Sequence, residues 1–497
     1  MARPFDADLQ SIQQARDLAA AAHAAQQAFA GFSQQDVDRI CSAMAEAAYD
    51  ESERLGRLAQ EETGYGVAAH KTIKNQFAAR KVWESIRDVK TVGVIREDPK
   101  ARIVEIGWPM GVVAALIPST NPTSTLIYKS LIAVKARNAI VHAPHPSAVK
   151  CCVEAGRVLQ GAGEAAGMPK GLVETLSLVS LPGTQALMHH PHVAVILATG
   201  GPPMVRAAHS AGKPALGVGP GNVPCYVDRS ADIPKAALDI VSSKAFDNSL
   251  ICATEQAVVA DRPIAAALAA EMERLGACFI TEGEADALRR TLFFPDGGIN
   301  VKSVGQTPQV LARMAGITVP EHARILVARL AKIGSEEPLS REKLTTVLGW
   351  YEADGWQAGC DRCIALIQFG GRGHSLVIHA TNEEVILRFG LEKPVFRIVV
   401  NTMSTLGAIG QTTGVAPSLT LGSGGIGGAI TGDNISAVNL LNVKRLAYEV
   451  APPPAAARVA IHGRGTASPA WSQAEVEEVV RQVVRALRRG KANRVIG

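Results

Sequence analysis

The sequence has few of the features that mark membrane-spanning, disulfide-rich or nucleic-acid-binding proteins. Aromatic residues make up 4% of 497 residues and the formal net charge is +5, so no nucleic-acid signature is present. No apolar run reaches the roughly 18 residues of a membrane span. The eight cysteines are scattered, and the one CxxC pair, Cys360 and Cys363, lacks partners for a metal site. The first ten residues have no signal-peptide core. We expect a cytoplasmic protein that binds no membrane, nucleic acid or metal.

The composition instead favours an α/β enzyme with a large core. Hydrophobic residues make up 47% of the chain and glycine occurs 46 times, which favours Ala/Val/Leu-rich layers joined by glycine turns. Residues 8 to about 88 have helical spacing. Two β-branched runs between Val92 and Pro109 are expected to pair as strands. The length allows two or three domains.

Two strand–turn–helix units follow, of the kind that binds nucleotides. The first has an apolar run from Gly111, a helix over 123–135 and the strand AIVHAPHP. The second begins at Val193, turns at Gly200 and Gly201 and continues as a helix. This turn lacks GxGxxG, so by itself it fits a phosphate site or a tight connection equally well.

The stretch FDNSLICATEQ, residues 246–256, contains the candidate nucleophile Cys252. A thiolate attacks an aldehyde carbon, and the adduct can lose hydride to leave a thioester on the protein. A free cysteine is more often a small buried hydrophobe. The stretch by itself leaves both interpretations open.

Five motifs together resemble the aldehyde dehydrogenase superfamily, and more narrowly its coenzyme A-acylating branch. They are IPSTNPTST (117–125), GVGPGNVP (217–224), SLICATEQ (249–256), FGGRGHS (369–375) and PSLTLGSGGIGG (417–428), and the resemblance covers about residues 8–448. It implies an aldehyde dehydrogenase-like α/β fold with a Rossmann-type cofactor domain, a second α/β catalytic domain and an oligomerisation β-ribbon. The expected boundaries are 1–230 for the NAD-binding domain with its ribbon at about 91–109, 231–425 for the catalytic domain, and 426–450 for a return to the cofactor domain and ribbon.

The resemblance also implies roles for individual residues. Cys252 matches the nucleophile and Asn121 the oxyanion asparagine, whereas without the resemblance Asn121 is a turn or N-cap residue. His374, with a pKa near neutral, is expected to take the proton of coenzyme A, and Glu342 to orient it or contact the cofactor; structural roles are equally compatible. NAD and coenzyme A are the implied co-substrates. The implied cofactor-binding residues are Ser119, Thr120, Pro144, His145, Thr199, Gly200, Gly201, Met204, Gly217, Val218, Gly219 and Gly424.

One departure from the family pattern favours the acylating branch. Hydrolytic members carry a Glu-Leu-Gly-Gly motif whose glutamate helps water to cleave the thioester, and the matching stretch 216–222 reads LGVGPGN, without an acid. Without that base water is a poor second nucleophile, whereas the thiol of coenzyme A needs less help. We therefore expect oxidation of a short-chain aldehyde, such as acetaldehyde or propionaldehyde, to acyl-CoA. The alternatives are a hydrolytic NAD-dependent dehydrogenase and a non-catalytic assembly organiser.

The C-terminal tail has a different composition. Residues 451–470 are rich in Pro, Ala and Gly, which predicts a flexible linker, and 471–497 contain an amphipathic helix over about 473–489 that begins with a Ser472–Glu475 capping box. The segment resembles the encapsulation peptides of bacterial microcompartment enzymes. We expect the 471–489 helix to bind a shell or cargo protein inside such a compartment, with docking on its own chain as the alternative. The ribbon and final strand favour a homodimer or a dimer of dimers.

Overall fold

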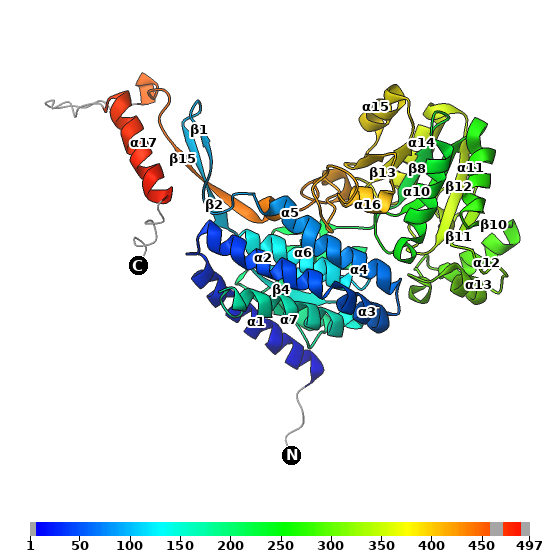
Figure 1. The fold of residues 1–497 in the computed structure, drawn as a ribbon, viewed down its shortest axis with the longest axis horizontal. Coiled ribbons are helices and arrows are strands. Elements are labelled where there is room, and N and C mark those ends of the chain that lie inside the picture. The colour runs from blue at the N-terminus through cyan, green and yellow to red at the C-terminus, as the bar shows by residue number, and fades with distance from the viewer. Residues whose placement is uncertain (1–5, 458–470, 489–497) are drawn as a thin grey trace, which may run out of the picture.

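The computed structural model describes residues 6–457 and 471–488. It has two lobes, each built around a parallel sheet, and a three-stranded ribbon that projects from the first lobe (Figure 1). Helices begin the chain and cover the first lobe. Their bounds are α1 Ala7–Phe29, α2 Gln34–Asp50, α3 Ser52–Thr63, α4 Ala68–Gln76, a π-helix η1 Phe77–Lys81 and α5 Val82–Ile86.

A five-stranded parallel sheet forms the first lobe, in the order β5-β4-β3-β6-β7. Its central strand is buried along its whole length, as the apolar run from Gly111 predicts. The strands are β3 Val112–Ile117, β4 Ala139–Pro144, β5 Val173–Thr175, β6 Val193–Thr199 and β7 Ala215–Val218, and the helices among them are α6 Pro122–Lys135, η2 Pro146–Ala148, α7 Val149–Ala165, α8 Leu181–Met188 and α9 Pro202–His209.

A seven-stranded parallel sheet forms the second lobe, in the order β10-β11-β12-β9-β8-β13-β14. Its strands are β8 Val223–Val227, β9 Glu255–Asp261, β10 Ala277–Ile280, β11 Ile325–Arg329, β12 Val347–Ala353, β13 Leu376–His379 and β14 Ile398–Val400. The longer helices that connect them are α10 Ile233–Ala245, α11 Arg262–Arg274, α12 Glu282–Leu292, α13 Pro308–Ala315, α14 Gly355–Phe369, α15 Glu383–Glu392 and α16 Ser404–Ala408.

The change from one sheet to the other corrects the expected boundary at residue 230. β8 pairs with β9 and β13 of the second sheet, so the crossing falls between Val218 and Val223. The boundary was placed too late because β8 is an apolar strand like those of the first sheet, whereas its hydrogen-bond partners lie beyond residue 250. The loop LGVGPGN is therefore the link between the lobes.

The ribbon consists of β1 Gly93–Asp98, β2 Ile103–Pro109 and β15 Leu441–Ala447. Both neighbours pair antiparallel with the middle strand β2, which confirms the predicted strand pairing. The chain thus returns from the second lobe and pairs β15 with β2, which lies more than 300 residues earlier in the sequence. Figure 1 shows β15 in orange beside the blue β2. A role of the ribbon in joining subunits stays a prediction.

The tail helix is α17, Gln473–Arg488. Its predicted capping box is present, because Ser472 Oγ and the Glu475 carboxylate exchange hydrogen bonds with each other's backbone N–H groups. The helix contacts β1 of its own chain and buries Val484, whereas Val479 stays 40% exposed. Most of the predicted linker, residues 458–470, lies outside the described residues. Within 6–457 and 471–488, no helix has the length and hydropathy to span a bilayer.

Candidate active site

Three of the candidate catalytic residues lie in loops that directly precede strands of the seven-stranded sheet. Glu342 precedes β12, Cys252 precedes β9 and His374 precedes β13, and the inter-lobe link that ends at Asn222 precedes β8, which lies between β9 and β13. The strands are parallel, so all four loops lie at the amino edge of the sheet. Residues distant in the sequence are thereby brought together around one thiol.

The turn that precedes Cys252 has an unusual backbone. Asp247, Asn248 and Ser249 have φ angles of 48°, 52° and 69°, three successive non-glycine residues in the left-handed region. Such residues cost roughly 1 kcal/mol or more each, although Asp and Asn tolerate the region better than most. Lys244 Nζ donates to Ser249 Oγ at 3.0 Å and Asn248 Nδ2 donates to the Gly305 carbonyl at 2.8 Å. The surrounding structure therefore holds the strained turn in place.

Cys252 is partly exposed as a residue, although its thiol is strongly desolvated. Desolvation and the nearby Glu342 carboxylate raise the pKa of Cys252 to about 12, while Arg397 acts in the opposite direction. Both charges come from parts of the chain far from Cys252 in the sequence, so the motif around the cysteine does not reveal them. Without a bound ligand, the thiol is almost entirely protonated at neutral pH.

Gly221 lies where the inter-lobe link passes the nucleophile. A Cβ there would overlap the carbonyl oxygen of Cys252 and would lie 3.0 Å from His374 Nδ1. The N–H of Gly221 donates to Glu342 Oε1 at 3.0 Å. Burial raises the pKa of Glu342 to about 7, against which this hydrogen bond acts. The acid-free loop 216–222 is thus contacted by a carboxyl group from another part of the chain.

His374 is only 1% exposed, and its surroundings differ from expectation. Burial, with a contribution from Arg397, lowers the pKa of His374 to about 3. The imidazole is therefore neutral at pH 7 and a weak base, contrary to the near-neutral pKa expected from sequence. Its Nδ1 lies 3.0 Å from Ser375 Oγ, and Nε2 has no hydrogen-bond partner among the described residues.

Arg397 belongs to this site, although no sequence motif pointed to it. It is 4% exposed and donates to the carbonyls of His374, at 2.7 Å, and Gly432, also at 2.7 Å. It also bonds to the carbonyl of Gly422 and to the side chain of Asn434. The guanidinium thereby joins the GGRGH loop to the glycine-rich loop 417–434.

Asn121 reaches the thiol loop from the carboxyl end of β3 in the first lobe. It is the N-cap of α6, but its side chain makes no capping hydrogen bond. Nδ2 donates to Thr120 Oγ1 at 3.0 Å and to the Leu250 carbonyl at 3.2 Å. The structure therefore brings the predicted amide to the segment that carries Cys252. Asn121 also occupies the N-cap position that the alternative expects, although its side chain does not cap the helix.

A cavity of about 200 Å³ lies at the carboxyl edge of the five-stranded sheet. Six predicted cofactor-binding residues line it, namely Pro144, His145, Thr199, Gly200, Gly201 and Met204. Its walls are mostly apolar, and Gly200 and Gly201 leave room where side chains would stand, as binding of a nucleotide requires. The other predicted residues, Ser119, Thr120, Gly217, Val218, Gly219 and Gly424, do not line this cavity.

Two of these residues have packing roles. A Cβ on Gly217 would come within 2.7 Å of His209 Nε2, so the glycine lets α9 pack closely on β7. Gly424, with φ of 59°, lies against the ring of Phe396, which leaves no space for a side chain. A sequence does not distinguish glycines required for close packing from glycines that make room for a ligand, because both occur in glycine-rich loops.

Comparison with known proteins agrees with this geometry. The profile of the Aldehyde dehydrogenase family matches residues 6–277, which is more than half of the chain. The chain belongs to the aldehyde dehydrogenase family. It is 43% identical over 425 residues, 84% of this chain, to aldehyde-alcohol dehydrogenase 2 of Entamoeba histolytica. The match covers only 49% of that relative, so the chain spans about half of its length.

Solved structures of this family cover the chain more fully. An acetylating aldehyde dehydrogenase from Geobacillus thermoglucosidasius has a TM-score of 0.89 at 49% identity, with coverage of 91% of this chain and 100% of that one. A propionaldehyde dehydrogenase from a Clostridium phytofermentans microcompartment has a TM-score of 0.80 at 30% identity, covering 89% and 98%. A Rhodopseudomonas palustris propionaldehyde dehydrogenase, solved with bound CoA and an acylated cysteine, has a TM-score of 0.80 at 29% identity, covering 87% and 97%.

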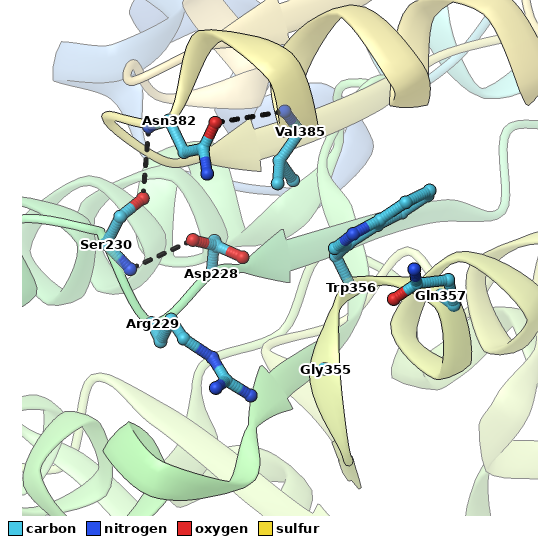
Figure 2. Close-up of a pocket in the computed structure, with 8 residues that line it drawn as sticks. All are labelled: Asp228, Arg229, Ser230, Gly355, Trp356, Gln357, Asn382 and Val385. Atoms are coloured by element: carbon cyan, nitrogen blue, oxygen red, sulfur yellow. Dashed lines mark hydrogen bonds between the residues drawn. The ribbon is translucent and has the colours of Figure 1, made fainter.

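Figure 2 shows the lining of a second cavity, of about 300 Å³. This cavity and Cys252 lie at opposite edges of the seven-stranded sheet. Its lining residues follow the carboxyl ends of β8, β12 and β13. The polar groups there bond to each other: Asp228 accepts from the Ser230 N–H, and Ser230 Oγ accepts from the Asn382 N–H. Arg229 is paired with Asp261.

Proposed function

We propose that the chain is a coenzyme A-acylating aldehyde dehydrogenase in which Cys252 carries the acyl group. One observation supports this proposal most strongly. The partly exposed Cys252, the Asn121 amide and the turn at Gly221, which contains no acid, lie close together. A solved relative with bound CoA and an acylated cysteine supports the same assignment.

The residues of the chain divide the reaction between them. Cys252 first loses its thiol proton to solvent, and the thiolate sulfur then forms a bond to the aldehyde carbon. The carbonyl oxygen becomes an oxyanion, which accepts hydrogen bonds from Asn121 Nδ2 and a backbone N–H. Loss of hydride from this adduct leaves a thioester on Cys252. The thiolate of coenzyme A then attacks the acyl carbon, and Cys252 leaves as the thiolate. Removal of one oxyanion donor from such a site typically raises the barrier by about 3–4 kcal/mol.

The neutral His374 is better suited to accept a hydrogen bond than to hold a proton. Its unpaired Nε2 gives the thiol of coenzyme A a partner, and the proton is then passed to a stronger base. Glu342, with its pKa of about 7, is the nearby group suited to receive it. This assignment replaces the direct proton transfer to histidine expected from sequence.

The cavity between β3, β4 and β6 suits the dinucleotide. Pro144, His145 and Met204 would contact the adenosine half, while Thr199, Gly200 and Gly201 would approach the pyrophosphate through their backbone. NAD, when bound, supplies the acceptor for the hydride. Preference for NAD over NADP is part of the proposal, as is a short-chain aldehyde such as acetaldehyde or propionaldehyde.

A location inside a bacterial microcompartment is a further part of this proposal. The amphipathic α17, with Val479 and Val483 partly exposed, offers a surface for a shell or cargo protein. A structural neighbour from a microcompartment supports this idea. Assembly through the ribbon into a homodimer or a dimer of dimers completes the proposal.

A hydrolytic dehydrogenase is the second candidate, and one observation favours it. Glu342 places a carboxyl group beside Gly221 and close enough to Cys252 to raise the pKa of the thiol. A carboxylate there has the chemistry to activate water against a thioester. The missing glutamate of the 216–222 motif therefore does not exclude hydrolysis by itself.

The test is NADH formation from propionaldehyde and NAD, with and without coenzyme A. We expect formation to require coenzyme A and to disappear in Cys252→Ala, with propionyl-CoA as the product by mass spectrometry. Equal rates without coenzyme A, with propionate as product, would establish the hydrolytic enzyme. In that case Glu342→Gln should stop turnover after one equivalent of NADH.

A further inference from the structure

A buried lysine joins the oxyanion amide to the nucleophile turn. Lys74 on α4 is 1% exposed, and its ammonium group donates to both Asn121 Oδ1 and Asp247 Oδ2. Asn121 belongs to the first lobe, and Asp247 begins the strained turn that leads to Cys252. One side chain therefore contacts both parts of the proposed chemistry without touching the thiol.

The contact with Lys74 decides which way the Asn121 amide faces. An ammonium group is only a donor, so the atom that faces it must be the amide oxygen. The amide nitrogen is then directed to the other side, where it donates to the Leu250 carbonyl at 3.2 Å, two residues before Cys252. Without Lys74 the orientation of the amide depends on the longer hydrogen bond to the Leu250 carbonyl, and nothing on the oxygen side disfavours its flip.

Asp247 holds the other end of the arrangement. Its Oδ1 accepts from the Val67 N–H at 2.7 Å, and its own N–H donates to His70 Nδ1 at 2.8 Å. A Cβ on Gly66 would overlap Asp247 Oδ1, so the close approach depends on that glycine. The turn before Cys252 is thus fixed to the α3–α4 connection.

A neighbouring lysine provides a matched control. Lys71 is 2% exposed and donates to the same Asp247 Oδ2, at 3.3 Å, and to the Thr120 carbonyl at 3.1 Å, but no bond joins it to the Asn121 side chain. Removal of either lysine leaves Asp247 with the other, so neither variant creates an unpaired buried carboxylate.

We propose that Lys74 is a positioning residue, which holds the Asn121 amide with its N–H donors toward Cys252 while Asp247 fixes Lys74 to the nucleophile turn. The inference rests on the proposed role of Asn121 as the oxyanion donor. It predicts that Lys74 affects the reaction only through Asn121.

The experiment is a double-mutant cycle with Lys74→Met, Asn121→Ala and the double variant, on the full chain. The readout is acylation of Cys252 by p-nitrophenyl acetate, which forms an oxyanion but needs neither NAD nor coenzyme A. We expect roughly a hundredfold loss for Asn121→Ala, about tenfold or more for Lys74→Met, and no further loss when Lys74→Met is added to Asn121→Ala. Lys74→Arg, which keeps a cationic donor, should recover most of the rate.

Two measurements separate positioning from loss of structure. Lys71→Met should lower the melting temperature about as much as Lys74→Met but reduce acylation less than threefold. Iodoacetamide alkylates Cys252 without forming an oxyanion, so the rate of this alkylation should change less than twofold in Lys74→Met. The proposal would be overturned if Lys74→Met lowered the acylation rate by the same factor with Asn121 present and with Asn121→Ala. It would also be overturned if Lys74→Met lowered the alkylation rate as much as the acylation rate.

The outcomes also separate this inference from the proposed function. If the wild-type enzyme forms NADH without coenzyme A, the acylating assignment fails while the acylation cycle still reports on Lys74. If Lys74→Met does not fold, Lys74→Gln replaces it. An amide can donate to Asp247, but unlike an ammonium group it can also accept, so it does not require the Asn121 oxygen to face it. Additive losses in that cycle would equally contradict the inference.

Discussion

The two parallel sheets of this protein use opposite edges. The five-stranded sheet has its cavity and Asn121 at the carboxyl ends of its strands, where α/β proteins usually bind ligands. The seven-stranded sheet has Cys252, His374 and Glu342 at the amino ends, and the cavity at its carboxyl edge contains polar groups that bond to one another. Contacts such as Asn121 to Leu250 join the two functional edges. In the proposed reaction the second sheet supplies the thiol and the first sheet supplies the oxyanion amide, so the general rule about carboxyl edges does not locate the proposed catalytic residues of the second sheet.

The largest expected effect is at the thiol of the amino edge. Cys252→Ser replaces sulfur with an oxygen that ionises far less readily, so we expect loss of at least about a thousandfold in NADH formation. Thermal denaturation should be almost unchanged, since the two side chains are similar in size. Activity above a tenth of wild type would mean that the chemistry lies elsewhere than at this edge.

A smaller effect is expected where the link between the lobes passes Cys252. Gly221→Ala places a methyl group against the Cys252 carbonyl and His374, so the loop must move, and we expect a loss of about ten- to a hundredfold in kcat/KM. The matched control is Gly283→Ala in α12, where an added Cβ has open space. The control should keep its activity and gain slightly in stability, because alanine favours helix. Equal activity of the two variants would contradict close packing at Gly221.

The electrostatics of the amino edge predict a pH dependence. Because the pKa of Cys252 is about 12, its alkylation by iodoacetamide in the free enzyme should accelerate about tenfold per pH unit from 7 to 9, with no plateau. Glu342→Gln removes a negative charge that raises this pKa, yet its amide oxygen can still accept from Gly221. Alkylation of this variant at pH 8 should be several-fold faster.

Other cysteines make a site-specific measurement necessary. Cys278 is also partly exposed, so the Cys252 peptide must be followed by mass spectrometry, with Cys252→Ala as the blank. A plateau near pH 8, or a slower reaction in Glu342→Gln, would mean that the thiol is activated in the free enzyme.

The smallest effects are expected at the carboxyl edge of the seven-stranded sheet. Gln357→Ala and Trp356→Phe alter the lining of the cavity in Figure 2 but leave its hydrogen bonds among Asp228, Ser230 and Asn382 intact. We expect kcat and KM within twofold of wild type. A change of more than tenfold in kcat or KM would mean that the carboxyl edge of this sheet also takes part in the reaction.

The sequence by itself determined the local elements and was enough to propose which residues react. Apolar runs and turn residues predicted β3, α6, β4 and β6 closely, and Ser472 with Glu475 predicted the start of α17, because these features depend on neighbours within one or two turns. The resemblance of five short motifs selected Cys252 and Asn121. Short-range patterns and motif chemistry were sufficient for both.

Only the tertiary structure decided the electrostatics and the supports of the site. Lys74 and Asp247 are 173 positions apart, and Glu342 and Gly221 are 121 apart, so no local pattern signals that they meet. The pKa of His374 falls to about 3 because packed elements bury it, and burial is a property of the assembled core. The boundary at β8 was set in the same way, by hydrogen bonds to strands that come later in the chain. Long-range packing therefore decides how residues selected by sequence can act.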